Sequence, residues 1–233
     1  MNIKEYIKTH SWVLNLCAWC YRFIGNNKMN IKGKDNSFNI NVSGLFLSHS
    51  RFFVRGNHNS LLFLPNKNGE VTHFKNLNIS VFGNNNTIVI GPHSSGEGFS
   101  IYVEDDNNQV VLGEHFTVGN NCDFSVLEGT KIEVGEDCQL SANIKLRTGD
   151  SHSITNLQGV RTNPSISIKI GNHVWIGNTV LIFKGANIAD NSIIAGGSVV
   201  SGKTFPPHSI IGGNPAKVIK DNVNWDRRRL PID

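Results

Sequence analysis

The sequence predicts an all-β protein in which short parallel strands wind into a three-sided coil, because it contains a long regular repeat and an unusual composition. Large aliphatic side chains recur at every sixth position, and a small or slim residue follows each of them four positions later. The aliphatic positions are Ile170, Ile176, Ile182, Ile188, Ile194 and Val200, and the slim ones are Val174, Val180, Ala186, Ser192, Ser198 and Thr204. A helix repeats every 3.6 residues and a strand every 2, so a period of six indicates a strand followed by a corner. Three such units make a coil of about 18 residues whose interior the aliphatic side chains fill.

The composition agrees with a coil that has many tight corners. The chain of 233 residues contains 31 Asn and 23 Gly, the two residue types that best tolerate left-handed backbone conformations. Hydrophobic residues make up 39% and charged residues 17%, so the chain can bury a substantial core. The net charge of +4 is mild and spread along the sequence. Because a polyanion-binding protein usually shows a stronger basic stripe, we do not expect a nucleic-acid partner.

The N-terminal segment, residues 1–25, is predicted to form an amphipathic helix packed on the body of the protein. Its apolar part is interrupted by Asn15 and Arg22, and it is shorter than the ~20 apolar residues that a membrane-spanning helix needs. It has no cleavage signature of a signal peptide. Peripheral contact with a membrane through residues 1–24 is the alternative. The CxxC pattern of Cys17 and Cys20 has no second copy, so we expect neither a zinc site nor a redox site there.

Residues 26–111 contain a longer repeat. The segments IKGKDNSFNI (31–40), VRGNHNSLLF (54–63) and VFGNNNTIVI (81–90) each have a Gly turn, then Asn-Ser or Asn-Thr, then alternating apolar residues. The glycines Gly33, Gly56 and Gly83 are 23 and 27 residues apart. We therefore expect looser coils with bulges or small loops in this part of the chain.

Weaker hexads over residues 112–205 join this part to the regular repeat. Leu112, Val118, Val134, Leu140 and Leu146 occupy aliphatic positions, and Cys122 and Cys138 fall where small core residues are expected. The pattern fails between residues 149 and 166, because continued counting would place His152, Gln158 and Pro164 in the interior. This stretch is therefore predicted to be an extruded loop. Residues 206–233 leave the repeat and are expected to cap the open end, with Arg227, Arg228 and Arg229 as solvated surface charges.

Three segments resemble the hexapeptide-repeat acyltransferases that O-acetylate sugars and bacterial polysaccharides. They are IKLRTGDSHSI (144–154), IKIGNHVWIGNTVLIFKGANI (168–188) and IIAGGSVVSGKTFPPHSIIGGNPAKVIK (193–220). The resemblance implies a left-handed parallel β-helix and a homotrimer with active sites between subunits. It also implies acetyl-CoA as the donor and a carbohydrate as the acceptor, which we expect to be a bacterial surface or capsular polysaccharide. No metal is expected.

Acetyl transfer to a hydroxyl needs a base, and histidine is suited to this role because its pKa lies near neutral pH. His152 lies in the predicted loop and matches the position of the family's catalytic histidine. Asp150, or else a backbone carbonyl, is expected to support its imidazolium form. No nucleophilic Ser or Cys stands out, which favours direct attack on the thioester, with the oxyanion held by backbone N–H groups. His173 is a rival base, and Asn143 is a candidate hydrogen-bonding residue for the sugar.

The resemblance also implies where the donor binds. Trp175 and Gly177 are expected to lie against the donor, although Trp175 has the alternative of covering a subunit interface. The slim residues Ala195, Gly196, Gly197 and Ser198 would let the pantetheine arm lie close to the backbone. Lys203 and Lys217 are expected to contact the phosphates of the coenzyme, whereas each lysine considered alone would be a solvated surface charge.

Several other functions are compatible with parts of the sequence. N-acetylation of an amino sugar is the main alternative, because the same base serves an amine. A zinc carbonic anhydrase needs three histidines that include a pair five residues apart, and no two histidines here have that spacing. A non-catalytic structural or ice-binding solenoid would need regular outward ranks of Thr, and the outward positions here are irregular. A sugar nucleotidyltransferase would need a βαβ domain, and residues 1–110 show no such pattern. We expect the protein in the cytoplasm, with the inner face of the membrane as a peripheral alternative.

Overall fold

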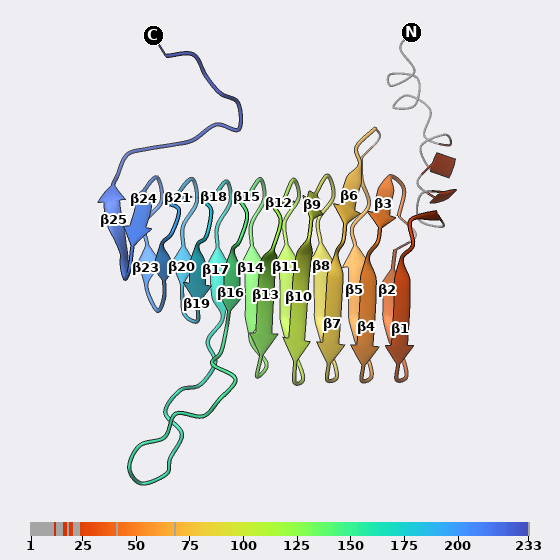
Figure 1. Cartoon of the computed structure of the whole chain (residues 1–233), viewed down its shortest axis with the longest axis horizontal. Helices are drawn as coiled ribbons and strands as arrows, with labels where there is room; N and C mark the ends of the chain where they lie inside the picture. Colours follow the sequence, from red (N-terminus) through yellow and green to blue (C-terminus); the bar gives the residue numbers. More distant parts are fainter. Residues whose placement is uncertain are drawn as a thin grey trace.

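The computed structural model describes residues 12, 16–17, 19–20, 24–40, 42–67 and 69–232. Their strands wind into a single solenoid, and each strand pairs with the equivalent strands of the coils before and after it (Figure 1). The helix predicted over residues 1–25 lies mostly outside the described residues. In the parts of the chain that are described, none of the helices is both long and apolar enough to cross a membrane.

Three sheets form the sides of the solenoid. Sheet A contains, in spatial order, β1 (Lys28–Lys32), β4 (Arg51–Arg55), β7 (Asn78–Phe82), β10 (Phe99–Glu104), β13 (Cys122–Leu127), β16 (Lys145–Arg147), β19 (Leu181–Phe183) and β22 (Val199–Val200). Sheet B contains β2 (Ser37–Asn39), β5 (Ser60–Phe63), β8 (Thr87–Ile90), β11 (Gln109–Leu112), β14 (Lys131–Val134), β17 (Ile168–Ile170), β20 (Asn187–Ile188) and β23 (Thr204–Phe205). Sheet C contains β3 (Leu45–Ser48), β6 (Thr72–Lys75), β9 (Ser95–Glu97), β12 (Thr117–Val118), β15 (Gln139–Leu140), β18 (Trp175–Ile176), β21 (Ile193–Ile194), β24 (Ile210–Gly213) and β25 (Ala216–Lys220).

The chain passes from sheet A to B to C and back to A, so the solenoid has three corners, named here A–B, B–C and C–A. The strand pairs are parallel, except that β25 lies antiparallel to β24 at the C-terminal edge of sheet C. The backbone hydrogen bonds therefore run mainly between coils, and each coil provides the edge on which the next one forms.

The interior confirms the repeat that the sequence predicts. The six aliphatic residues from Ile170 to Val200 are each at most 1% exposed, and Cys122 and Cys138 are also buried. The expectation for Thr204 is wrong, because Thr204 is exposed and Phe205 faces the interior instead. The last coil is one residue shorter than the one before it: Ile170 pairs with Ile188, but Ile188 pairs with Phe205. The hexad register therefore ends after Val200.

The N-terminal coils are larger than the hexad coils. Lys28 pairs with Arg51 and Arg51 with Asn78, steps of 23 and 27 residues, whereas Leu181 pairs with Val199, a step of 18. Part of the added length goes into longer strands of sheet A, such as the six-residue β10 and β13. The solenoid consequently has a broad sheet A at its N-terminal end.

A ladder of asparagines, buried at Asn59, Asn86 and Asn108, stabilises the A–B corner of these larger coils. The side-chain oxygen of each Asn accepts a hydrogen bond from the backbone N–H of the Asn in the next coil, at 2.8–3.0 Å, and the ladder runs through Asn36, Asn59, Asn86 and Asn108. At the same corner Gly33, Gly56 and Gly83 have φ values of 130–140°. A Cβ at Gly56 would lie 1.8 Å from the carbonyl oxygen of Gly83, so only glycine fits there. These contacts explain the Gly and Asn positions of the longer repeat.

The extruded loop that the sequence predicts leaves the solenoid between β16 and β17 (Figure 1). An isolated antiparallel bridge joins Thr155 to Arg161 within it. On either side of the loop the sheet register is continuous, because Leu146 of β16 pairs directly with Ile182 of β19.

The tail beyond β25 departs from the prediction for residues 206–233. Strand β25 covers the C-terminal edge of sheet C, as expected for a cap. Residues 224–228, named here the C-terminal strap, instead turn back along the solenoid and contact the B–C corner of three earlier coils. The end of the chain therefore ties successive coils together rather than closing the open end.

Candidate functional site

Each corner of the solenoid carries a column of residues in the left-handed conformation, one per coil. At the C–A corner this column contains Asn26, His49, Asn76, Gly98, Asn121, Asn143, Thr179 and Gly197, with φ values of 52–73°. The sequence-predicted site residues fall at two different corners. Asn143, Gly177 and residues 195–198 lie at or beside the C–A corner, whereas Asp150 and His152 belong to the loop that leaves the A–B corner.

At the C–A corner Asn143 is one rung of a polar ladder. Its side-chain oxygen accepts a hydrogen bond from Asn121 at 2.8 Å, and its amide donates to Asn178 at 3.2 Å. The side chain is exposed. The ladder fixes its orientation while leaving one amide hydrogen and an oxygen lone pair for a ligand. Its predicted contact with a sugar stays a prediction.

The segment from Ala195 to Ser198 forms a smooth surface of backbone. Ser198 is buried, and its hydroxyl donates to the carbonyl oxygen of Ala195 at 2.5 Å and accepts from the N–H of Gly213 at 3.2 Å. Its role visible in the structure is therefore to hold the corner. Gly196 and Gly197 are exposed, and a Cβ added at Gly197 would meet nothing within 4 Å. A long, thin ligand could lie directly on this backbone.

Gly177 and Trp175 lie in the preceding coil beside this surface. A Cβ at Gly177 would lie 2.6 Å from the backbone nitrogen of Gly196, so the glycine allows the two coils to pack. Trp175 projects from β18 and is 39% exposed. Its ring lies 6.1 Å from that of Trp225 in the strap, measured between centroids. The two indoles thus form an aromatic surface on sheet C, on the side of the B–C corner where the strap lies.

In the loop, the structure separates Asp150 from His152. His152 is exposed, and its ring forms no hydrogen bond with the described residues. The Asp150 carboxylate instead accepts hydrogen bonds from Lys184 at 2.5 Å and from Asn163 at 2.8 Å. The hydrogen bond from Lys184, followed by that from Asn163, holds the pKa of Asp150 below its ordinary value. Asp150 therefore contributes to loop structure in this conformation of the chain, and His152 projects freely.

Asn163 connects both ends of the loop, and sequence reasoning missed it. Its amide donates to Asp150 and to the backbone carbonyl of His152, both at 2.8 Å, and its oxygen accepts from the N–H of Ile154 at 2.7 Å. Asn163 is 6% exposed. It immediately precedes Pro164, a sequence signal for a constrained turn that could have drawn attention to it. The backbone at His152 is therefore held on both sides.

An ion pair anchors the same loop to the solenoid. Arg161 lies 2.6 Å from Glu128 at the A–B corner. The hydrogen bond from Arg161 is the main reason that the pKa of Glu128 falls to about 2. Together with the Lys184–Asp150 pair, it fixes the base of the loop at two points. Neither contact had a recognisable signal in the sequence, because the two partners of each pair are more than 30 positions apart along the chain.

The two predicted phosphate-binding lysines lie apart from each other. Lys203 follows β22 at the A–B corner, and Lys217 is on β25 at the end of sheet C. Both are exposed, and neither forms an ion pair with any residue that the structure describes. Each is therefore available for an anion, but no single-chain contact brings them together.

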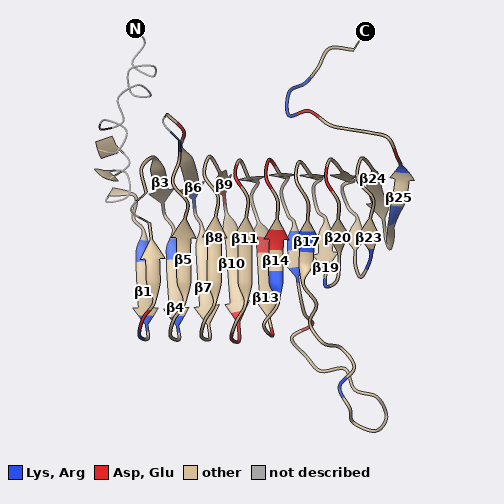
Figure 2. Cartoon of the chain, turned by 180° about the vertical axis from the view of Figure 1, so that it is seen from behind, with Lys and Arg blue, Asp and Glu red and all other residues tan. Residues whose placement is uncertain are grey.

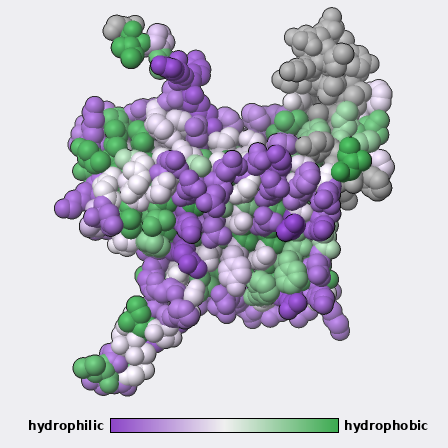
Figure 3. All heavy atoms as spheres, in the orientation of Figure 1, coloured by the Kyte–Doolittle hydropathy of each residue, from purple (hydrophilic) through white to green (hydrophobic). Residues whose placement is uncertain are grey.

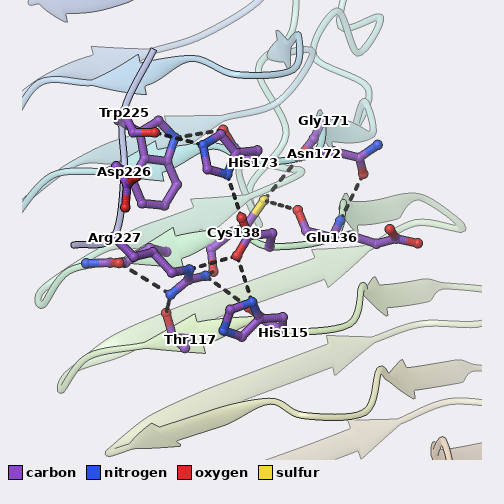
Figure 4. A network of polar contacts seen from close by, with 12 residues as sticks. His115, Thr117, Glu136, Cys138, Gly171, Asn172, His173, Trp225, Asp226 and Arg227 are labelled. Atoms are coloured by element: carbon purple, nitrogen blue, oxygen red, sulfur yellow. Dashed lines mark hydrogen bonds and ion pairs between the residues drawn. The ribbon is translucent and has the colours of Figure 1, made fainter.

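The B–C corner holds a network that the sequence did not predict (Figure 4). The carboxylate of Asp137 lies between three cationic or polar partners: His173 Nδ1 at 2.5 Å, His115 Nδ1 at 2.8 Å and Arg227 Nε at 2.7 Å. The second ring nitrogen of His173 lies 3.0 Å from the carbonyl oxygen of Trp225, and the two rings stack at 4.3 Å. Both ring nitrogens of His173 are thus occupied by oxygen atoms of the protein itself. While the strap is bound, neither ring nitrogen of His173 is open to a substrate, and its role as a rival base stays a prediction.

Arg227 is the central residue of the strap. All of its nitrogens donate hydrogen bonds, to Asp137, Thr117 and Gln139 side chains and to the backbone carbonyls of His115 and Cys138. The expectation that Arg227 is a solvated surface charge is wrong. Arg228 pairs with the neighbouring Asp226 and contributes no such link. The run of three arginines does not indicate which one turns inward, because the choice depends on coils about a hundred residues earlier.

The histidines and carboxylates of the described residues were compared with the ligand sets of metal sites. Among the residues that the structure describes, no group of three or more His, Cys, Asp or Glu side chains could hold a metal ion. The stacked pair His93 and His115, with ring centroids 4.7 Å apart, lacks a third ligand of this kind.

Comparison with known proteins gives a consistent result. No family model matches the sequence. The polysialic acid O-acetyltransferase of Neisseria meningitidis is 31% identical over 206 residues, which cover 88% of this chain and 92% of that protein. The galactoside O-acetyltransferase of Escherichia coli (strain K12) is 30% identical over 120 residues, 52% of this chain and 58% of that protein.

Two solved structures share the fold. The crystal structure of the polysialic acid O-acetyltransferase OatWY superposes with a TM-score of 0.76 and 28% identity over 88% of this chain and 92% of that one. That of the polySia-specific acetyltransferase NeuO gives a TM-score of 0.67 and 28% identity over 87% and 81%. The predicted left-handed parallel β-helix is confirmed. The chain therefore belongs to the hexapeptide-repeat O-acetyltransferases.

Proposed function

We propose that this enzyme transfers the acetyl group of acetyl-CoA to a hydroxyl of a sialic-acid polymer. The observation that supports this most strongly is the match along almost the whole chain to a protein named for that reaction, at 31% identity. The larger N-terminal coils are part of this match, whereas the match to the galactoside enzyme covers only about half of the chain. The N-terminal coils are therefore where we expect specificity for an acidic polymer.

The C–A corner is suited to bind the donor. Gly196 and Gly197 present bare backbone on which an extended pantetheine arm can lie, and Trp175 borders this surface. Lys217, beyond the end of this corner, is exposed and free to pair with a phosphate of the coenzyme.

His152 is proposed as the general base. A ring nitrogen of His152 takes the proton of the acceptor hydroxyl while its oxygen attacks the carbonyl carbon of the thioester. When the tetrahedral adduct collapses, the C–S bond breaks, and the imidazolium returns the proton to the leaving thiolate. The products are an acetyl ester and free coenzyme A, with no net change in protons. Backbone N–H groups of the coil wall are expected to hold the oxyanion.

The distance between the proposed base and the proposed donor surface within one chain supports assembly into a homotrimer. In one chain, the His152 loop leaves the A–B corner and the donor surface lies at the C–A corner. If three solenoids pack around a three-fold axis, the loop of one subunit can reach the donor surface of its neighbour. The active sites would then lie between subunits, and Asp150 would stay bound to Lys184 rather than orient the base.

A defined set of acceptors tests this proposal. Purified enzyme with acetyl-CoA should release thiol and add acetyl mass to polysialic acid, and do neither at comparable rates with a galactoside or an amino sugar. Acetylation of the amino sugar as the fastest reaction would identify the N-acetyltransferase alternative. The variant His152→Ala should lose about 10²–10⁴-fold in kcat, the usual contribution of a general base, with a matched Gln158→Ala variant in the same loop unchanged. Wild-type rates in His152→Ala would remove the assignment of the base.

Two further proposals concern the setting of the reaction. The acceptor polymer would be a bacterial surface or capsular polysaccharide, acetylated in the cytoplasm or at the inner face of the membrane. Fractionation of expressing cells, with and without residues 1–24, measures whether this segment directs the enzyme to membranes. Equal recovery of both forms in the soluble fraction would contradict a membrane role.

A further inference from the structure

The first two strands of sheet A carry an unusual arrangement of like charges. On the outer face, Lys28 of β1 is directly opposite Arg51 of β4, and Lys32 is directly opposite Arg55. Like charges in directly opposed positions destabilise a sheet. None of the four forms an ion pair within the described part of the chain. Figure 2 shows the Lys and Arg positions at this end of the solenoid in blue. The fold therefore retains a repulsion that an external anion would relieve.

Two hollows border the first of these pairs. One, of about 290 Å³, is lined by Lys28 and Arg51 with the polar side chains of Asn26, His49, Asn76 and Asn78. The other, of about 490 Å³, is lined by the same two cations and by Met29, Asn30, Phe52 and Phe53. A polar hollow and an apolar hollow thus share one pair of cations. This combination matches an acidic sugar residue, which has a carboxylate, hydroxyl groups and an apolar face of C–H bonds.

A column of aromatic side chains extends from the apolar hollow across sheet A. The rings of Phe53, Phe82 and Tyr102, on β4, β7 and β10, contact in sequence with centroid distances of 5.4 and 5.7 Å. Arg55 lies over the Phe53 ring at 4.9 Å. Figure 3 shows a hydrophobic patch on this face over the N-terminal coils. The column crosses the strands, so a chain of sugars lying on it would run along the solenoid towards β16.

The polar hollow lies at the same corner as Asn143 and the proposed donor surface. Asn26, His49 and Asn76 belong to the C–A column of left-handed residues that also contains Asn143 and Gly197. Four coil steps separate His49 from Asn143, which is ~19 Å at the ~4.8 Å spacing of neighbouring strands. A single sugar could not occupy both places, whereas a polymer can.

We propose that the outer face of β1 and β4 at the C–A corner is a second binding site for the acceptor, specific for a carboxylate-bearing sugar residue of a glycan polymer. Lys28 and Arg51 bind the carboxylate, with the forked guanidinium of Arg51 suited to bidentate contact. Phe53 supports the sugar ring. The site holds the polymer while a residue several sugars away reacts. The polymer's identity as polysialic acid rests on the proposed function, but the binding of an acidic glycan does not.

The double variant Arg51→Gln/Arg55→Gln in the full-length enzyme tests this. Binding of polysialic acid, measured by calorimetry, should weaken at least tenfold. The KM for the polymer should rise by a similar factor, while kcat and the kinetics with a sialic acid dimer stay unchanged. The matched control Lys169→Gln/Arg229→Gln removes the same charge from other exposed positions and should change neither. Because the variant relieves like-charge repulsion, its melting temperature should be equal or higher.

The other outcomes overturn the proposal. Unchanged polymer affinity in the double variant removes it. Equal loss of affinity for polyglutamate would show a general anion site rather than a glycan site. A change in oligomer mass by light scattering would show that a second copy of the chain covers this face instead. If the wild-type enzyme acetylates no sialic polymer, the proposed function fails, but calorimetry with polysialic acid and neutral dextran still decides whether this site binds acidic glycan.

Discussion

The guanidinium of Arg227 lies 2.7 Å from the carboxylate of Asp137, a residue 90 positions earlier in the chain. This contact joins the non-repetitive tail to the middle of the solenoid. The same carboxylate also binds His115 and His173, so one side chain gathers contacts from three separate segments. The strap consequently holds Trp225 beside Trp175, which borders the proposed donor surface.

Replacement of Arg227 should release the strap. Arg227→Gln loses most of five hydrogen bonds and leaves Asp137 without its guanidinium partner, which should cost about 1.5–3 kcal/mol for charged hydrogen bonds. Hydrogen exchange of the strap amides should accelerate, and trypsin should cleave after Arg228 sooner. Arg229→Gln, at an exposed position of the same tail, is the control and should behave like the parent. Equal protection in both variants would contradict the anchoring role.

Acidification should loosen the strap in two stages. Burial, together with the charge of Arg227, lowers the pKa of His115 below its ordinary value of 6.5 despite the neighbouring Asp137. As the pH falls, the unfolded chain therefore protonates His115 before the folded chain does. The contribution of His115 to stability is complete above about pH 6.5 and decreases as the pH drops towards the lowered pKa. Burial raises the pKa of Asp137, but hydrogen bonds from His173 and Arg227 outweigh it and hold the pKa below 3.8. The contribution of the Asp137 carboxylate to the stability of the fold is present above pH 3.8 and is lost as the pH falls through the lowered pKa.

Thermal unfolding between pH 8 and pH 3 measures these two stages. The groups around His115 are Asp137, Arg227 and the stacked His93. The variant His115→Asn should lack the stage just below pH 6.5 and keep the one below pH 3.8. A stability profile of this variant parallel to that of the parent would show that another group titrates there.

Asn163→Ala should impair catalysis more than folding. The variant loses the contacts that fix the backbone of His152 and the carboxylate of Asp150, so the proposed base should sample more positions. We expect kcat to fall about 10–100-fold, in line with the sensitivity of rates to small misplacements. The melting temperature should change little, because the loop lies outside the solenoid core. Gln158→Ala is the control, and an unchanged kcat in Asn163→Ala would mean that the loop is positioned by other contacts.

Gly197→Asn should block the donor surface without breaking the fold. Gly197 has a φ of 73° and open space where a side chain would project, and asparagine tolerates this conformation better than other residues. The KM for acetyl-CoA should rise at least tenfold with a nearly unchanged melting temperature. Gly129→Asn, at the A–B corner with a φ of 67°, is the matched control. An unaffected KM in Gly197→Asn would place the coenzyme elsewhere.

Gly56→Ala should be far more damaging to stability than either of these changes. Its Cβ would lie 1.8 Å from a backbone oxygen of the next coil at a φ of 136°, so the coils must separate. We expect a loss above about 4 kcal/mol, the range reserved for severe backbone or core disruption. Thermal unfolding of the purified variant, followed by circular dichroism, measures this loss of stability. Failure of the variant to accumulate as soluble protein would indicate the same loss. Parent-like unfolding would show that the corner can relax.

The regular features of the molecule were predictable because they repeat. Every coil places its inward residues under the same constraint, so a period of six from Ile170 to Val200 was sufficient to predict the solenoid and its interior. The failure of that period at His152 marked the loop for the same reason. The Gly and Asn positions of the N-terminal coils also repeat, and they proved to form the corner ladder.

The unpredicted features depend on single contacts between distant segments. Nothing adjacent to Asp150 in the sequence indicates that Lys184 binds it, because the two meet only after the loop leaves the solenoid. Arg227 and Arg228 have the same local sequence character, yet one reaches Asp137 and the other pairs with Asp226. Thr204 shows a third limit, since a coil shortened by one residue moves the inward positions to Phe205 and Ile211, and no local signal marks that shortening.

The uninterrupted pairing of Leu146 with Ile182 means that the excursion carrying His152 adds nothing to the solenoid's own register. Such an excursion is a modular insert: the coils on either side would join without it. Transplanting residues 148–167 from a related enzyme, or exchanging them for a short turn, should therefore yield a chain that folds normally and differs only in its chemistry.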